Sequence, residues 1–282
     1  MIIPEINIQN VVHIPRLGLG TWEMGGRSSA DTSEDNKWID AIQMALAYGI
    51  RHIDTAETYG NGHSEELVSV ACAGLRRDQL FITSKVSGDN LRYDQVLRAA
   101  DGSLKRLRSD YIDLYLLHWP NPHVSIQETM RAINKLLENK LIKFFGLSNF
   151  PASLIEEVMD NTDAPIITNQ VEYNLFTRNN GTYNKNVEKD IIPFCLKQGI
   201  SITAWRPVIK GNKAVLDHPL IMDLAEKYGK TPMQIALNWL LHKPKMLVIP
   251  KMSSEKHIRE NIDAVTFTMN DESYQKLDNI NL

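Results

Sequence analysis

The feature that most constrains the fold is the regular alternation of short apolar runs with longer segments of helical periodicity. Eight runs of strand length recur along the 282 residues. Most begin about 30 residues apart, the size of a βα unit. They are mainly apolar, as expected of strands covered on both faces. The predicted strands are Leu17–Gly20, Ile50–Asp54, Leu80–Lys85, Ile112–His118, Phe144–Ser148, Ile166–Val171, Ile200–Trp205 and Leu247–Pro250.

The segments between these runs carry helical signals. Ile39, Ile42 and Leu46 share one face of a predicted helix, and Gly49 follows as a stop signal. A longer interval before the last strand predicts an additional helix over Pro219–Tyr228. Comparable apolar stripes run over 96–107, 126–137 and 232–241, the last opened by Thr231 as N-cap and Pro232 at the first helical position.

Eight βα units favour a closed barrel over an open, doubly wound sheet. An open sheet normally binds a dinucleotide through GxGxxG after its first strand, and the segment GLGTWEMGG at 18–26 lacks that pattern. The expected fold class is therefore α/β, with a (β/α)8 TIM barrel formed by residues 1–282 as a single domain. Residues 1–14, turning at Gln9-Asn10, are expected to form an N-terminal β-hairpin that caps the barrel floor.

Composition argues against several classes of protein. The formal net charge is −3 with acids and bases interspersed, which is unlike the basic stripe of a nucleic-acid binder. No apolar stretch reaches the length of a membrane span, and MIIPEINIQN is unlike a signal peptide. Cys72 and Cys195 have no metal or redox spacing and are expected to be reduced thiols. A cytoplasmic protein with no nucleic-acid or membrane partner is expected.

Polar residues lie where the predicted strands end, which is where such barrels place their chemistry. The second strand ends in Asp54, with Tyr59 five residues later, the third ends in Lys85 and the fourth in His118. Taken singly, such an aspartate is more often a turn or helix cap, such a lysine a solvated side chain, and such a histidine a hydrogen-bonded core residue. Together they indicate a site. The later strands end in Ser148-Asn149, Asn169-Gln170, Trp205-Arg206 and Lys251.

The chemistry suited to these four residues is proton delivery. A phenol with a pKa of about 10 is a weak acid at neutral pH, and an adjacent Lys⁺ makes its proton easier to release. Asp54 can hold Lys85 charged, and His118 can donate a hydrogen bond to a carbonyl oxygen. Such a site has a general acid, Tyr59, but no nucleophile and no metal. A hydride would therefore have to come from a cofactor.

The sequence resembles the aldo-keto reductase superfamily. The resemblance implies a (β/α)8 barrel that reduces aldehydes or ketones, usually with NADPH bound extended. It implies Tyr59 as general acid, Lys85 as its pKa-lowering partner, Asp54 as the anchor of Lys85, and His118 as the residue that orients the carbonyl. The motifs that carry it are GLGTW (18–22), HIDTAETYGNG (52–62), ITSKV (82–86), DYIDLYLLHWP (110–120), GLSNF (146–150), NQVEYN (169–174) and VIPK (248–251).

The resemblance also implies a cofactor site. Ser148, Asn149 and Gln170 match the residues that hold the nicotinamide carboxamide. Trp205 replaces the tyrosine that usually stacks on the ring, and it can supply the same aromatic face. Arg206 replaces a small residue near the pyrophosphate. It either pairs with the pyrophosphate or is a solvated loop arginine. Further expected cofactor contacts are Gly20, Thr21, Trp22, Asp54 and Pro207.

The adenosine end departs from the NADPH-specific pattern. Lys251 is kept, but Met252 stands at the serine position and His257 at the arginine position. A neutral histidine is a poorer dianion partner than a bidentate arginine. NADPH is still the expected cofactor because Lys251 remains, with NADH or dual use as the alternative. Ser253 and Ser254 are expected to contribute, and Glu260 and Asn261 match the residues that hold the adenine.

The substrate is expected to be a small carbonyl compound. After the helix that contains Asn261 little chain remains, so a flap over the site is expected to be absent or short. This favours small aldehydes, dicarbonyls or sugars over steroids. Arg27 or His123 could contact a carboxylate or hydroxyls, although solvated loop residues are the commoner reading. The expected lining is Trp22, Tyr59, His118 and Trp119, with Met24 as a further candidate; the alternative for the non-catalytic residues is packing at the barrel rim.

Two other functions stay open. Some members of this superfamily are cofactor-bound regulatory subunits of ion channels, and a binding module can retain all four site residues. A metal-dependent barrel hydrolase or isomerase needs several His and carboxylate ligands. Only Asp54 and His118 qualify, and Lys85 would oppose a cation between them. Members of the family are often monomers, but the sequence does not decide the oligomeric state.

Overall fold

A sheet of eight parallel strands forms the centre of the molecule. The computed structural model describes residues 3–208 and 216–280. The strands are neighbours in chain order from β3 to β10, and a parallel bridge between Leu17 and Val248 joins the two edges into a (β/α)8 barrel. Their bounds are β3 (Gly18–Gly20), β4 (His52–Asp54), β5 (Phe81–Val86), β6 (Ile112–Leu117), β7 (Ile142–Ser148), β8 (Ile166–Glu172), β9 (Ser201–Trp205) and β10 (Met246–Val248).

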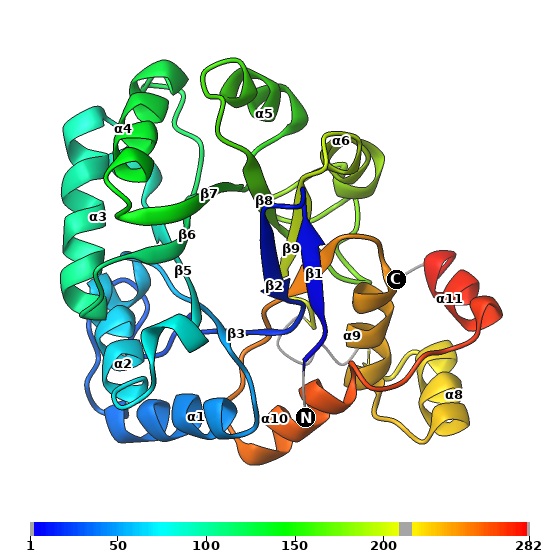
Figure 1. Cartoon of the computed structure of the whole chain (residues 1–282). Coiled ribbons are helices and arrows are strands. Elements are labelled where there is room, and N and C mark those ends of the chain that lie inside the picture. The colour runs from blue at the N-terminus through cyan, green and yellow to red at the C-terminus, as the bar shows by residue number, and fades with distance from the viewer. Residues whose placement is uncertain (1–2, 209–215, 281–282) are drawn as a thin grey trace.

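Helices surround this sheet (Figure 1). Short 3-10 turns, η1 (Tyr59–Gly62), η2 (Arg77–Gln79) and η3 (Gly88–Asn90), and the π-helical turn η4 (Val187–Ile191) lie between strands and helices. The α-helices of the described residues are α1 (Asp35–Ala47), α2 (His63–Ala71), α3 (Tyr93–Leu107), α4 (Ile126–Glu138), α5 (Ala152–Met159), α6 (Ile192–Lys197), α8 (Pro219–Tyr228), α9 (Pro232–His242), α10 (Glu255–Asp263) and α11 (Asp271–Asp278).

The predicted elements are confirmed with small shifts at their ends. The additional helix has the predicted bounds, and α9 begins at Pro232 with a capping box between Thr231 and Gln234. The prediction that the last strand reaches Pro250 is wrong, because β10 ends at Val248. Pro250 has no N–H to donate to a ladder, and its carbonyl instead accepts the N–H of Gly20 at 3.1 Å.

The predicted N-terminal hairpin is present as β1 (Glu5–Ile8) and β2 (Val12–Pro15). Gln9 and Asn10 turn the chain with φ of 51° and 59°, in the left-handed region that such turns require. The hairpin lies across the barrel in Figure 1. Ile8 and Ile14 are fully buried in a cluster with Leu114, Leu116, Ile167 and Leu247 of the strands, so the hairpin closes the floor of the barrel.

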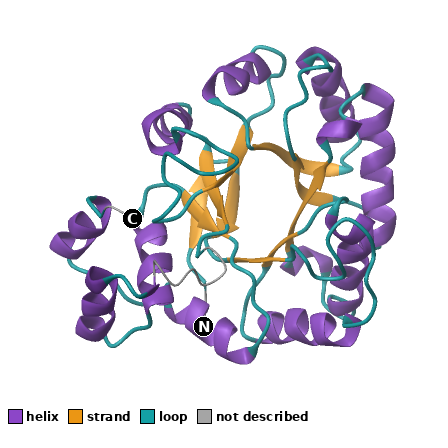
Figure 2. Cartoon of the chain, turned by 180° about the vertical axis from the view of Figure 1, so that it is seen from behind, coloured by secondary structure: helices purple, strands orange, loops and turns teal. Residues whose placement is uncertain are grey.

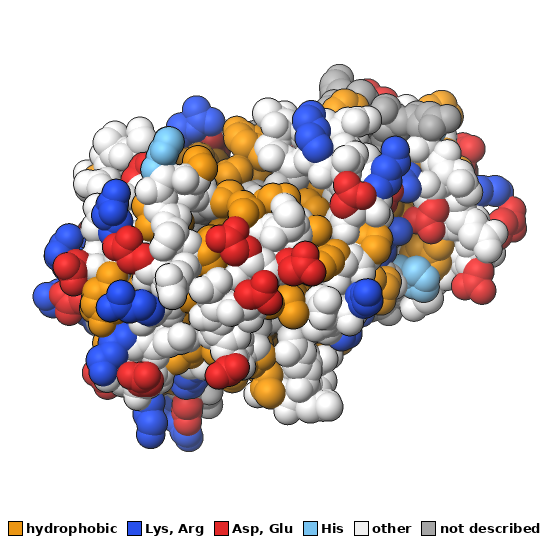
Figure 3. All heavy atoms as spheres, turned by 90° about the horizontal axis from the view of Figure 1, so that it is seen from above, with side chains coloured by type: hydrophobic (Ala, Val, Ile, Leu, Met, Phe, Trp, Pro, Cys, Tyr) orange, Lys and Arg blue, Asp and Glu red, His pale blue; other side chains and the backbone are white. Residues whose placement is uncertain are grey.

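The surface carries both signs of charge. Figure 3 shows acidic and basic side chains on the same face of the molecule. No helix in the described ranges is both long and apolar enough to cross a bilayer. Cys72 is half-buried and Cys195 is buried, and both are free thiols.

The floor gives a direct test of this packing. Ile14→Ala should lower the free energy of unfolding by about 2–5 kcal/mol, because it removes buried methyl groups and leaves a cavity. The matched control is His13→Ala, whose side chain lies on the exposed face of the same strand and should change stability by less than about 0.5 kcal/mol. Urea unfolding of both variants measures the difference. Equal effects would show that the hairpin does not pack on the barrel.

Candidate active site

The end of the barrel opposite the hairpin gathers the polar residues. Figure 2 views the molecule from the side opposite to that of Figure 1 and shows loops around the strands. Asp54 ends β4 and Ser148 ends β7, while Lys85 and Gln170 lie within one or two residues of the ends of β5 and β8. Because all eight strands are parallel, their carboxyl ends meet on one side.

Lys85 is the centre of the site and is fully buried. Its Nζ donates to Asp54 Oδ1 at 2.6 Å, to the carbonyl of Thr55 at 2.8 Å and to the phenol oxygen of Tyr59 at 3.2 Å. The other carboxylate oxygen of Asp54 accepts from Gln170 Nε2 at 2.8 Å. Three acceptors therefore compensate the buried ammonium, and one of them is charged.

The electrostatics of Tyr59 differ in part from the sequence-based expectation. Burial raises the pKa of the Tyr59 phenol and Lys85 lowers it, with a net pKa above the ordinary value. Lys85 thus acts in the expected direction but does not overcome desolvation. Burial also lowers the pKa of Lys85, but Asp54 and Tyr59 more than offset this, so its pKa lies above the ordinary value. At neutral pH the site holds a protonated phenol beside an ammonium.

A sharp turn holds Tyr59 beside Lys85. The residues after it, Gly60, Asn61 and Gly62, have φ of 57°, 53° and 92°. A Cβ on Gly60 would lie 2.2 Å from the carbonyl oxygen of Gly25, so only glycine fits there. The turn leads directly into α2 and fixes the direction in which the phenol leaves the backbone.

His118 follows β6 and lies beside Tyr59, with their ring centres 5.7 Å apart. Its Nδ1 is 3.4 Å from the hydroxyl of Thr58. Burial and then the charge of Lys85 lower the pKa of His118 well below the ordinary value. The imidazole is therefore neutral at neutral pH and carries one N–H, which suits it to donate a hydrogen bond to an uncharged oxygen.

The residues expected at the nicotinamide meet beside this group. Asn149 Nδ2 donates to Ser148 Oγ at 2.9 Å, and Trp205 Nε1 donates to Asn149 Oδ1 at 3.1 Å. Asn149 has φ of 64°, an uncommon conformation that turns its side chain back onto the strand ends. With Gln170, these side chains place amide and hydroxyl groups next to an aromatic ring. This donor set fits a nicotinamide carboxamide and ring.

Arg206 is partly exposed and forms an ion pair. Its Nη1 lies 3.3 Å from Glu172 Oε1, and Glu172 is only 3% exposed. Its guanidinium also lies 5.4 Å and 5.2 Å from the ring centres of Tyr183 and Trp205. Arg206 is therefore a partner of Glu172. The next residue, Pro207, is buried.

The segment GLGTW (18–22) forms part of the barrel wall. A Cβ on Gly20 would lie 2.6 Å from the carbonyl oxygen of Ile249, so the strand edges approach closely there. Thr21 is fully buried, and both its amide and its hydroxyl donate to the carbonyl of Asp54 at 3.0 Å. These two residues close the wall beside Asp54.

The adenosine-end residues lie on α10 and the segment before it. Lys251 Nζ is 4.0 Å from Glu23 Oε2 and 4.5 Å from the Trp38 ring centre. Met252 is fully buried, so its side chain is directed into the core. On the exposed side, Ser253 Oγ lies 3.2 Å from His257 Nδ1, and Ser254 Oγ caps α10 by accepting the N–H of His257. On the same helix Glu260 is half-buried and Asn261 is buried.

The expected substrate residues divide into two groups. Trp22 is 37% exposed with its ring 4.9 Å from Tyr59, and Trp119 is half-buried with its ring 6.3 Å from His118. Both lie beside the Tyr59 and His118 rings, and their contact with a substrate stays a prediction. The expectation for Met24 is wrong, because its side chain is fully buried in the core. The two polar candidates are exposed: Arg27, which pairs with Glu23 at 2.9 Å, and His123.

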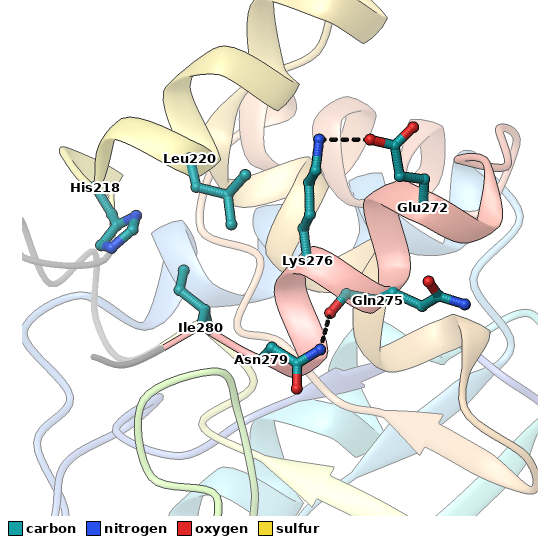
Figure 4. Close-up of a pocket in the computed structure, with 7 residues that line it drawn as sticks. All are labelled: His218, Leu220, Glu272, Gln275, Lys276, Asn279 and Ile280. Atoms are coloured by element: carbon teal, nitrogen blue, oxygen red, sulfur yellow. Dashed lines mark hydrogen bonds and ion pairs between the residues drawn. The ribbon is translucent and has the colours of Figure 1, made fainter.

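Other parts of the molecule carry different features. In the ranges 3–208 and 216–280, no group of three or more His, Cys, Asp or Glu side chains is placed to hold a metal ion. A hollow of about 630 Å³ lies between α8 and α11, with His218, Lys276 and Asn279 among its lining (Figure 4). Its lining includes none of Asp54, Tyr59, Lys85 and His118.

Fold and site together define a (β/α)8 barrel with a buried phenol beside side chains that fit a nicotinamide. The chain belongs to the aldo/keto reductase family of oxidoreductases, whose family model matches residues 16–282. It is 33% identical to the glyoxal reductase of Bacillus subtilis (strain 168), over 98% of this chain and 92% of that protein. It is 35% identical to the methylglyoxal reductase DkgA of Escherichia coli (strain K12), over 94% and 88%.

A solved structure agrees with this assignment. The aldo-keto reductase from Klebsiella pneumoniae in complex with NADPH has a TM-score of 0.88 and 31% identity, over 99% of this chain and 95% of that chain.

Sequence reasoning missed three residues at the mouth. Glu23 is next to Lys251, Glu172 holds Arg206, and Tyr183 lies against two tryptophans. Glu172 is two residues beyond Gln170 on β8, so the period of a strand could have placed it on the same face. Tyr183 lies in a long connection with no periodic pattern, and nothing in the sequence indicates its position.

The buried pair predicts an asymmetric effect on stability. Lys85→Met should lower the free energy of unfolding at neutral pH by about 3–5 kcal/mol, because it leaves the carboxylate of Asp54 buried without its cation. Adding Asp54→Asn removes that charge and should recover part of the loss. Urea unfolding of the two variants measures this. A double variant no more stable than Lys85→Met would show that the unpaired charge is not the cause.

Proposed function

We propose that this protein reduces small aldehydes and α-dicarbonyls to alcohols with NADPH. The observation that carries the proposal is the protonated phenol of Tyr59, held 3.2 Å from the buried ammonium of Lys85 at the mouth of the barrel. The names of the relatives, a glyoxal reductase and a methylglyoxal reductase, support the substrate class. The NADPH complex of the Klebsiella pneumoniae protein supports the cofactor.

The cofactor, when bound, would supply the hydride. Ser148, Asn149 and Gln170 would hold its carboxamide, and Trp205 would lie against its ring. The 2′-phosphate at the adenosine end of the cofactor would be held by Lys251, with Ser253, Ser254 and His257 at the start of α10. Further contacts are proposed for Gly20, Thr21, Trp22, Asp54, Arg206, Pro207, Glu260 and Asn261.

The protein's own part in the reaction is to orient the carbonyl and supply a proton. The N–H of neutral His118 would donate to the carbonyl oxygen and fix its position, with Trp22 and Trp119 beside it. Tyr59 would give its phenol proton to that oxygen as negative charge develops there. The phenolate that remains lies next to the Lys85 ammonium, which stabilises it. Asp54 keeps that ammonium charged and in place.

We further propose that residues 1–282 act as one domain, in the cytoplasm and without a nucleic-acid or membrane partner. NADPH is the proposed cofactor because Lys251 is kept. NADH or dual use stays the alternative, since Met252 is buried and His257 replaces a permanent cation. A monomer is the simplest form consistent with this proposal.

Tyr59→Phe tests the role of the acid. It should lower kcat for methylglyoxal by about 10²–10⁴-fold, the usual contribution of a positioned acid, with little change in the Kd for NADPH. Steady-state oxidation of NADPH and quenching of protein fluorescence measure the two quantities. Full activity in Tyr59→Phe would refute the assignment. Tight NADPH binding with no turnover of any carbonyl by the wild type would favour the regulatory-binder alternative.

His257→Arg tests the phosphate end. A guanidinium at this position should lower KM for NADPH roughly tenfold, as expected for one added charge-assisted hydrogen bond of about 1.5 kcal/mol. The KM for NADH, which has no 2′-phosphate, is the internal control and should stay the same. An unchanged KM for both cofactors would show that position 257 does not face the phosphate.

A further inference from the structure

Aromatic rings form a continuous arc around the mouth of the barrel. The arc begins at Trp22 after β3 and ends at Trp205 of β9. Neighbouring ring centres are 4.9 to 6.3 Å apart, within the range of direct aromatic contact. The rings, in order, are Trp22, Tyr59, His118, Trp119, Tyr183 and Trp205.

Tyr183 is the member that completes this arc. Its ring centre lies 5.6 Å from that of Trp119 and 5.3 Å from that of Trp205. Trp119 follows β6 and Trp205 ends β9, and these strands are separated in the sheet by β7 and β8. Tyr183 therefore bridges two tryptophans that the strands alone would leave apart. It is 48% exposed, so much of the side chain remains accessible.

A buried carboxylate fixes the backbone of this tyrosine. The N–H of Tyr183 donates to Glu172 Oε2 at 3.3 Å, and Glu172 Oε1 pairs with Arg206. The N–H of Glu172 donates in turn to Oδ1 of buried Asn184 at 3.0 Å. Gly181 permits the approach, since a Cβ there would lie 3.0 Å from Glu172 Oε2.

Glu172 also holds a cation beside the ring of Tyr183. It holds Arg206, whose guanidinium lies near both the Tyr183 and Trp205 rings. The position of Tyr183 is thus set by a charged, buried group as well as by its own loop.

We propose that Tyr183 is a specificity-determining residue that narrows the mouth and selects carbonyl compounds with a small substituent. This inference rests on the proposed function. A carbonyl held by Tyr59 and His118 has its substituent among the rings of the arc. A methyl group fits beside them, whereas a phenyl group must displace the ring that spans Trp119 and Trp205. Glu172 is the positioning residue for Tyr183.

Two variants of Tyr183 test the inference. Methylglyoxal and phenylglyoxal carry the same reacting group with a small and a large substituent. Tyr183→Ala should raise the ratio of kcat/KM for phenylglyoxal to that for methylglyoxal by about tenfold, the low end of what one pocket contact gives. Tyr183→Phe keeps the ring and should leave the ratio within about twofold of the wild type. The Kd for NADPH, measured by fluorescence quenching, should not change in either variant.

The outcomes separate this inference from the proposed function. An active Tyr183→Ala enzyme with an unchanged substrate ratio overturns the inference and leaves the proposed function intact. A changed Kd for NADPH with an unchanged ratio also overturns it, because Tyr183 would then cover the cofactor site. A wild type that binds NADPH but reduces neither dicarbonyl overturns both. Circular dichroism of the variants confirms that the comparison is between folded proteins.

Discussion

The mouth of the barrel depends on the ion pair between Lys85 and Asp54. Removing an ammonium from water costs several kcal/mol, and a site of this kind forms only where that cost is offset. Here the offset comes from a carboxylate at 2.6 Å, a backbone carbonyl and a phenol. The pair is a poor route to stability, since apolar side chains would fill the same space at lower cost. Its proposed role is to stabilise the phenolate of Tyr59.

The ion pair also orders its surroundings. Asp54 accepts from Gln170 across the barrel, so β8 is tied to β4, the strand that anchors the lysine. The backbone carbonyl of Asp54 holds the amide and hydroxyl of Thr21 in the neighbouring wall. Asp54 thus links β3, β4, β5 and β8 at one end of the barrel, and Tyr59 is held there by its hydrogen bond with Lys85.

The sequence predicted the barrel because its signals are local. Apolar runs at regular intervals, the cap formed by Thr231 and Pro232, and glycine and asparagine at turns each reflect interactions within a few residues. The end of β10 was predicted less well because the apolar run continues to Pro250, beyond the last paired residue, Val248. The carbonyl of Pro250 accepts the N–H of Gly20, which is distant in the chain. The positions of Asp54, Tyr59, Lys85 and His118 could be predicted because each lies at or just beyond a strand end, where parallel topology determines its neighbours.

What sequence reasoning missed depends on contacts between loops. Glu172 and Arg206 were not predicted to pair because they lie at the ends of different strands, far apart in the chain. Tyr183 was not predicted to reach the mouth because the connection between β8 and η4 has no repeating pattern. Met24 was predicted to line the pocket because it follows the first strand, but the turn after Thr21 directs it into the core. The net pKa of Tyr59 also depends on burial, which a sequence does not state.

The hairpin at the floor has a consequence for how this protein can be handled. Because β1 and β2 lie at the end of the barrel away from the aromatic arc, a group joined ahead of β1 would be attached at the end opposite Tyr59. A fusion partner or a tether to a solid support at this end would leave the route to Tyr59 open. The two ends of the barrel are therefore separate: the hairpin end can be used for attachment while the end that carries Tyr59 stays accessible.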